Sequence, residues 1–102
     1  NGMIFTSGVI PVNPATGEIP KGVEAQADQA IKNLVNLLTE AGSSAEKVVK
    51  TTVFIKEMND FGKINEIYAK YFVNKPARSC VAVKTLPKNV LCEVEMIAAV
   101  EK

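Results

Sequence analysis

Two stretches of the chain repeat their apolar residues at helical spacing. From Val23 to Ala41 the apolar positions recur every three or four residues, and Gly42 follows where a helix commonly ends. Between Phe61 and Phe72 the apolar positions follow the same spacing, and Asn59-Asp60 precedes them as a candidate N-cap. The pattern predicts two amphipathic helices, each with one apolar face to bury.

The remaining apolar stretches are typical of β-strands. Val48 to Ile55 is mostly apolar and rich in β-branched residues, and Ser79 to Val83 and Val90 to Val100 are further strands. Met3 to Ser7 is extended, and Val9-Ile10 continues the extended structure. The predicted order is therefore β, β, α, β, α, β, β. Two helices of similar length beside one sheet indicate a two-layer α+β sandwich.

The length of the chain fits one domain, residues 1–102, with no linker or repeat inside it. Its first two residues, Asn1-Gly2, form the strongest short signal for a hairpin turn, because both tolerate positive φ. A turn at this place needs a strand before it. We therefore expect an N-terminal strand ahead of residue 1.

Composition excludes several classes of chemistry. Twelve Lys and Arg stand against eleven Asp and Glu, which gives a net charge of +1 and argues against nucleic-acid binding. Histidine is absent, which removes Ser-His-Asp and Cys-His catalysis and histidine metal sites. No glycine-rich phosphate loop, transmembrane run or signal peptide is visible. The two cysteines, Cys80 and Cys92, form no CxxC pair, which favours a reducing, cytoplasmic setting.

The single arginine, Arg78, is the first candidate for a functional residue. Only arginine offers a planar fork that binds a carboxylate through two parallel hydrogen bonds. The last strand carries Glu93 and Glu95 on one face, because side chains alternate along a strand. Arg78 could bind the carboxylate of a ligand, or it could form a structural ion pair with Glu93 or Glu95. The spacing leaves both alternatives open.

The other chemical side chains favour simpler roles. Alternation places Cys80 on the same face as Arg78, where a nearby cation could favour its thiolate. Without a histidine base, a small core-lining cysteine is the better interpretation of Cys80, and Cys92 is assigned to the core. Tyr68 and Tyr71 lie at helical spacing and are expected to be packing residues with a solvated hydroxyl.

Seven short motifs, in this order and at compatible spacing, resemble the RidA (YjgF) family over essentially the whole chain. They are Phe5-Thr6-Ser7-Gly8, Ile10-Pro11, Thr16-Gly17-Glu18-Ile19, Asn59-Asp60-Phe61 with Asn65, Pro76-Ala77-Arg78-Ser79-Cys80, Leu86-Pro87-Lys88 and Glu93-Val94-Glu95. The resemblance implies a bacillus-type, chorismate-mutase-like α+β fold, with two helices on one face of a mixed sheet. It also implies a homotrimer with ligand sites in clefts between subunits.

The same resemblance implies an enamine/imine deaminase. Such an enzyme hydrolyses 2-aminoacrylate and 2-iminobutanoate-type intermediates to 2-keto acids and ammonia, without a cofactor or metal. Arg78 matches the arginine that clamps the substrate carboxylate, and Glu93 matches the acidic residue that positions or activates water. Cys80 matches a pocket-lining cysteine, Ser7 and Gly8 match a strand end bordering the cleft, and Asn65 matches an asparagine of the second helix.

Two departures from the family pattern bear on the site. The family carries an N-terminal Gly-Pro-Tyr segment whose tyrosine lines the pocket, and this sequence lacks it. The stretch from Phe72 to Pro76 is also shorter than usual, so a loop between Val73 and Asn74 is expected to be missing. Two alternatives to the deaminase stay open at this point: a non-catalytic module that binds small 2-keto acids, and a ribonuclease or translation inhibitor.

Overall fold

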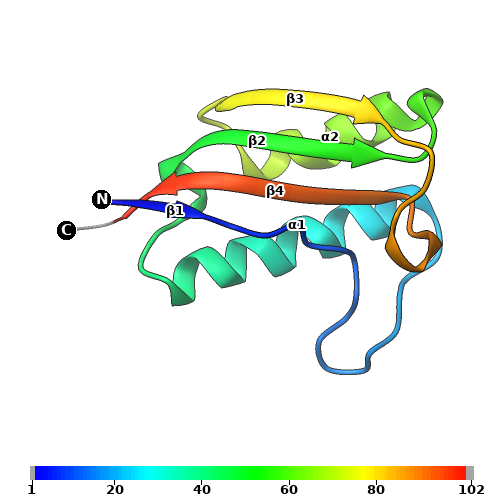
Figure 1. Ribbon diagram of the computed structural model, residues 1–102, viewed down its shortest axis with the longest axis horizontal. Coiled ribbons are helices and arrows are strands. Elements are labelled where there is room, and N and C mark those ends of the chain that lie inside the picture. The colour runs from blue at the N-terminus through cyan, green and yellow to red at the C-terminus, as the bar shows by residue number, and fades with distance from the viewer. Residues whose placement is uncertain (1, 101–102) are drawn as a thin grey trace.

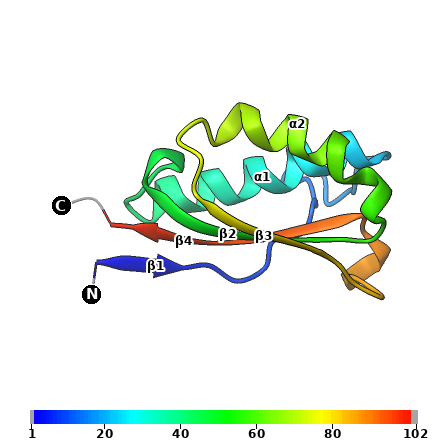
Figure 2. The same ribbon diagram turned by 90° about the horizontal axis from the view of Figure 1, so that it is seen from above.

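Two helices pack on one face of a four-stranded sheet in the computed structural model, which describes residues 2–100 (Figures 1 and 2). The elements are β1 (Met3–Phe5), α1 (Val23–Glu40), β2 (Val48–Ile55), α2 (Phe61–Tyr71), β3 (Ala77–Ala82) and β4 (Cys92–Ala99). The strand order is β1-β4-β2-β3, in which β2 and β3 are parallel and the other pairs antiparallel. The predicted two-layer α+β sandwich is confirmed.

The N-terminal segment differs from the prediction of two strands before the first helix. Only β1 is a strand there, and Val9 forms an isolated bridge with Val94. Two prolines and a turn follow this bridge, so the chain leaves the sheet before a second strand can form. Asn1, half of the predicted hairpin turn, lies outside the described residues. The strand expected before it, and the loop expected near residues 73–74, stay predictions.

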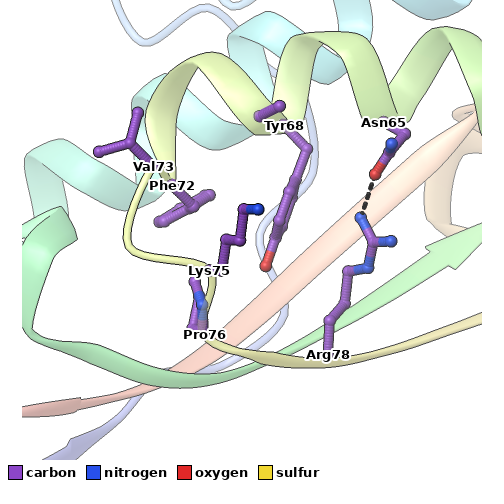
Figure 3. Close-up of a pocket in the computed structure, with 8 residues that line it drawn as sticks. Asn65, Tyr68, Phe72, Val73, Lys75, Pro76 and Arg78 are labelled. Carbon is purple, nitrogen blue, oxygen red and sulfur yellow. Dashed lines mark hydrogen bonds between the residues drawn. The ribbon is translucent and has the colours of Figure 1, made fainter.

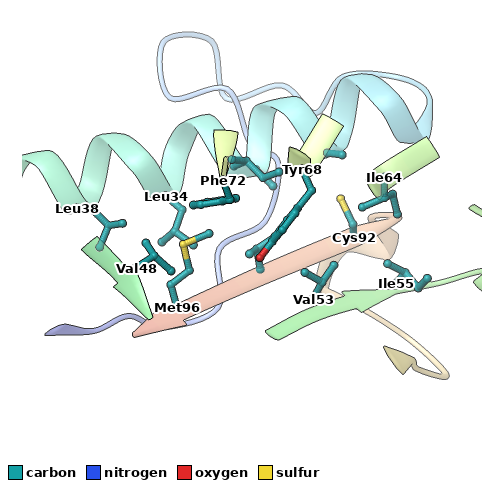
Figure 4. Packing of buried hydrophobic residues seen from close by; sticks show 14 of the residues in the cluster. Leu34, Leu38, Val48, Val53, Ile55, Ile64, Tyr68, Phe72, Cys92 and Met96 are labelled. Carbon is teal, nitrogen blue, oxygen red and sulfur yellow. The ribbon is translucent and has the colours of Figure 1, made fainter. Parts of the chain in front are cut away.

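The core lies between the helices and the sheet (Figure 4). Leu34 and Leu38 of α1 are fully buried against it. Along β4 every second residue is at most 2% exposed: Cys92, Val94, Met96 and Ala98. The predicted alternation is confirmed, and it turns Glu93 and Glu95 to the opposite face of the sheet.

The two helices begin and end by different means. At the end of α1, Gly42 has a φ of 94°, the Gly42 N–H donates to the Thr39 carbonyl, and the Ser43 N–H donates to the Leu38 carbonyl. This is a Schellman motif, as the glycine predicted. Asp60 holds the N-cap position of α2, as predicted, but it lies in a 3₁₀ turn with helical φ and its side chain makes no cap hydrogen bond.

A tight turn connects α2 to the edge strand β3. The Lys75 N–H donates to the Phe72 carbonyl over 3.1 Å, and Lys75 adopts a φ of 55°. Pro76 then starts the chain back beneath α2, in register with β2. The first residues of β3 therefore lie directly under the helix. Neither helix of residues 2–100 has the length and hydropathy needed to cross a bilayer.

Candidate active site

Arg78 lies on β3 with its side chain directed at α2 (Figure 3). Its Nη1 donates a hydrogen bond of 2.6 Å to Oδ1 of Asn65. Its guanidinium carbon lies 4.7 Å from the ring centroid of Tyr68 and 5.1 Å from that of Phe61. Both distances are within the range of cation–π attraction. We call Arg78, Asn65, Tyr68 and Phe61 the arginine half-site.

One face of α2 supplies all three partners of Arg78. Phe61, Asn65 and Tyr68 are four and three residues apart, so they stack along the same side of the helix. The edge position of β3 leaves the arginine free of a further strand on its outer side. The result is a guanidinium whose direction is fixed by two rings and one amide.

Tyr68 is itself held by a hydrogen bond to the sheet. Its hydroxyl and Oγ1 of Thr51 lie 2.7 Å apart, and Thr51 is the register neighbour of Arg78 on β2. Thr51 is fully buried and Tyr68 is 6% exposed, so the expected solvated hydroxyl is wrong for this tyrosine. Burial raises the pKa of Tyr68 above its usual value, more than the Thr51 hydrogen bond and the Arg78 charge lower it. The phenol is therefore a neutral support for the arginine.

A depression of about 550 Å³ opens beside Arg78. Its polar lining comes from Asn65, Tyr68, Lys75 and Arg78, while the remaining lining residues are Ala69, Phe72, Val73 and Pro76. No carboxylate of residues 2–100 lines it or pairs with Arg78. A cationic, partly apolar depression of this kind suits a small carboxylate with a short hydrocarbon chain.

Cys80 shares the helix-facing side of β3 with Arg78, as alternation predicted, and is half-buried. Burial raises the pKa of this thiol, and the charge of Arg78 opposes the shift without reversing it. A raised pKa disfavours the thiolate that a nucleophile needs. Cys80 packs against the edge of the hydrophobic core and does not line the depression beside Arg78. Cys92, whose pKa burial raises to about 12, belongs to the core itself.

Glu93 lies in a second group, on the other face of the sheet. The Glu93 carboxylate packs against Gly8, whose missing side chain leaves it room. Ser7 precedes Gly8 in the same segment, which runs along β4. The structure therefore brings Glu93 and Gly8 together. We call Glu93, Gly8 and Ser7 the carboxylate half-site.

The two half-sites are separate within one chain. Arg78 and Met96 flank Thr51 of β2, whereas Glu93 flanks Phe54, three residues further along. Standard strand geometry puts the Cα atoms of Arg78 and Glu93 roughly 14 Å apart, with the side chains on opposite faces. Glu95 shares the face of Glu93. The alternative of a structural ion pair from Arg78 to Glu93 or Glu95 is therefore wrong for this chain.

Sequence analysis missed three supports of the arginine: Phe61, Tyr68 and Thr51. The first two carried a usable signal, because they stand four residues before and three after Asn65 on the predicted helix. Thr51 carried none, since its role depends on the register between β2 and β3. Residues 2–100 contain no cluster of three or more metal-ligating side chains.

Comparison with known proteins gives consistent matches. The family model described as Endoribonuclease L-PSP matches residues 1–100. A 2-iminobutanoate/2-iminopropanoate deaminase of Escherichia coli is 50% identical over 100 residues, which cover 94% of this chain and 78% of the relative. A RutC family protein of Haemophilus influenzae is also 50% identical, with the same coverage.

Solved structures agree with these matches. The YjgF gene product of Escherichia coli has a TM-score of 0.93 and 48% identity, covering 97% of this chain and 81% of that one. The TdcF protein of Escherichia coli, solved with bound serine, has a TM-score of 0.94 and 46% identity, covering 98% and 82%. The described fold is thus shared almost completely with both.

Proposed function

This chain belongs to the YjgF/RidA family, and on that premise we propose that it is a 2-iminobutanoate/2-iminopropanoate deaminase, a hydrolase acting on C–N bonds. It hydrolyses imines and enamines of the 2-aminoacrylate type to 2-keto acids and ammonia. The observation that carries the proposal is the arginine half-site. A fixed guanidinium with no carboxylate partner among residues 2–100 stands over a depression of suitable size.

The arginine half-site recognises the substrate carboxylate. A charge-assisted hydrogen bond contributes about 1.5–3 kcal/mol, which is enough to orient a molecule of few atoms. Asn65 and the rings of Tyr68 and Phe61 keep the fork in place before binding, so less entropy is lost on association. The apolar lining of the depression, from Ala69, Phe72, Val73 and Pro76, surrounds the short carbon chain.

Glu93 directs the water. Its carboxylate accepts a proton from a water molecule as the water oxygen bonds to the carbon of the protonated imine, which gives a carbinolamine. The carboxyl group returns this proton to the amine nitrogen, the C–N bond breaks to release ammonia, and the hydroxyl proton passes to the carboxylate as the keto acid forms. Water attack on an imine is intrinsically easy, so positioning of the reactants supplies much of the acceleration. Ser7 and Gly8 border the carboxylate and offer backbone groups to the ligand.

A complete site needs two copies of the chain. Arg78 and Glu93 of one chain are too far apart to touch one molecule of four carbons, as the register requires. We therefore place Arg78 of one protomer opposite Glu93 of the next. A contact between different surfaces of identical chains forms a ring when its rotation closes, and a closed ring of three is the homotrimer that the family resemblance implies.

Two experiments test these statements. Coupled to a threonine dehydratase, the wild-type protein should accelerate ammonia release from 2-iminobutanoate; the absence of any acceleration overturns the deaminase in favour of a 2-keto acid binding module.

Arg78→Ala and Glu93→Ala should each be inactive. Refolded together in equal amounts they should recover roughly a quarter of the activity, because one pairing in four holds both intact residues. Zero recovery contradicts the shared site.

The alternative of a ribonuclease or translation inhibitor has the printed description of the family model behind it. The net charge of +1 and the absence of histidine favour the deaminase over this alternative. RNA binding that falls steeply with salt would revive it. Cys80 and Cys92 are free thiols, which agrees with a cytoplasmic location, where the dehydratase products arise.

A further inference from the structure

We propose that Gly8 is a positioning residue for Glu93: the absence of a Cβ at Gly8 lets the Glu93 carboxylate reach its working place. This inference rests on the proposed deaminase function. Gly8 does not need glycine for its backbone, since its φ lies outside the left-handed region that other residues avoid. Its role is therefore the close approach of another group.

The contact at Gly8 is specific to the carboxylate. A Cβ built on Gly8 would overlap Oε2 of Glu93, and it would lie 2.9 Å from Cδ and 3.3 Å from Cγ. Real Cβ atoms do not approach this closely, so either the glutamate or the backbone must move when a methyl group is added.

The backbone around Gly8 is anchored on both sides. The Thr6 N–H donates to the Met96 carbonyl, and the Met96 N–H donates to Oγ1 of Thr6, each over 2.9 Å. On the other side, Val9 and Val94 exchange two backbone hydrogen bonds of 2.8 and 3.1 Å. A methyl group at Gly8 therefore displaces the flexible glutamate more readily than the backbone.

The segment also contains an extra residue opposite β4. Between the anchored pairs Thr6–Met96 and Val9–Val94, the N-terminal segment has two residues while β4 has only Glu95. Such a bulge bends the strand and redirects its side chains, and bulges are frequent beside active sites. Here the bulge sets Gly8 over Glu93.

The test is a double-substitution cycle with Gly8→Ala and Glu93→Asp. Gly8→Ala should lower kcat about 100-fold with little change in KM, because a misplacement of about 1 Å costs that much. Glu93→Asp withdraws the carboxylate by one methylene group. In that background Gly8→Ala should cost less than about twofold, since the overlap is gone. Equal losses in both backgrounds overturn the proposal.

A matched control and a second readout complete the design. Gly62 also lacks a positive φ, and a Cβ there meets nothing within 4 Å, so Gly62→Ala should leave kcat unchanged. In protein labelled at glutamate, Gly8→Ala should shift the ¹³C resonance of the Glu93 carboxyl, whether or not the protein is a deaminase. If the Glu93 resonance does not shift in Gly8→Ala, the positioning role is refuted. If the resonance shifts but the wild-type protein shows no deaminase turnover, only the proposed function is refuted. If Gly8→Ala fails to fold, recovery of folding in Gly8→Ala/Glu93→Asp supports the contact, and continued failure counts against it.

Discussion

The sheet has one face beneath the two helices and an opposite face that neither helix covers (Figure 2). On the covered face Thr51, Val53 and Met96 are at most 2% exposed, and Arg78 lies at the margin. On the open face Glu93 and Glu95 are half-buried and Phe5 is 73% exposed. The covered face is completed within the chain. The open face carries carboxylates and exposed apolar area that neither helix covers.

This difference separates stability from function along single strands. Neighbouring residues of β4 have different roles. Cys92 and Val94 fill the core, while Glu93 between them borders the proposed site. Alternation lets one strand do both without compromise. Substitutions on the two faces should therefore have different consequences, which the following experiments measure.

The largest effect on stability is expected for Leu34→Ala. Leu34 is fully buried between α1 and the sheet, so its truncation should lower the free energy of unfolding by about 2–5 kcal/mol, from lost burial and the cavity left behind. Urea unfolding measures the change. Leu37 is the matched control, because it lies on the same helix and is 43% exposed; Leu37→Ala should cost less than about 1 kcal/mol. Phe5→Ala, on the open face, should lower the free energy of unfolding much less than Leu34→Ala. Equal losses would contradict the contrast between the two faces of the sheet.

The next effect is on turnover, through Arg78→Lys. Lysine keeps the charge but loses the planar fork and the stacking on Tyr68 and Phe61. A loss of about 1.5–3 kcal/mol of oriented binding corresponds to roughly a 10- to 150-fold fall in kcat/KM for 2-iminobutanoate. Lys63→Arg, on the exposed side of α2, should change nothing. If Arg78→Lys kept the wild-type kcat/KM, Arg78 would not be the residue that binds the substrate carboxylate.

A smaller effect is expected from the hydroxyl pair beneath the arginine. Thr51→Val keeps the side-chain shape and leaves the Tyr68 hydroxyl unpaired in the core, which should cost about 1–3 kcal/mol of stability. Adding Tyr68→Phe should restore part of the loss, because no polar group then stays unpaired. Thr52 is the control, since it follows Thr51 on β2 and faces the open side. Equal costs for Thr51→Val and Thr52→Val would contradict the contrast between the faces.

The smallest effect concerns the alkaline limb of stability. The Tyr71 hydroxyl donates to Asp28 over 2.6 Å, and burial, followed by the Asp28 carboxylate, raises the pKa of Tyr71 to about 12. A tyrosine with a raised folded pKa stabilises the protein below pH 10 and loses that contribution as pH rises from about 10 to 12. Stability of the wild type should therefore fall more steeply over this window than that of Tyr71→Phe. Parallel curves in urea unfolding at pH 9 and pH 11 would show that the link is unimportant.

The sequence was sufficient for both helices and for the strands that follow the first helix, but not for the second N-terminal strand expected at Val9-Ile10. The alternation of apolar residues around Glu93 identified which side of β4 faces the helices, because that relation is local. The family resemblance supplied the candidate functional residues by their motifs. The Schellman end of α1 followed from Gly42, since a glycine at that place has one common use.

Relations between elements were not accessible in the same way. Alternation places Arg78 and Cys80 on the same face of β3. It does not say whether Arg78 and Glu93 lie on the same face of the sheet, because that depends on the strand order and register. The ion-pair alternative for Arg78 failed for this reason. The solvated hydroxyl predicted for Tyr68 was wrong because its partner Thr51 lies 17 residues earlier, on a strand rather than on the same helix.

The three partners of Arg78 also restrict how the chain length can vary. Each residue inserted into α2 or deleted from it rotates the following part of the helix by about 100°. A single insertion between Phe61 and Tyr68 would turn one partner away from the guanidinium while β3 stayed in place. Between the start of α2 and Arg78, the chain length can therefore change without turning these partners away only after Tyr71, in the turn before Pro76. Libraries that vary loop length should retain activity there and lose it inside the helix.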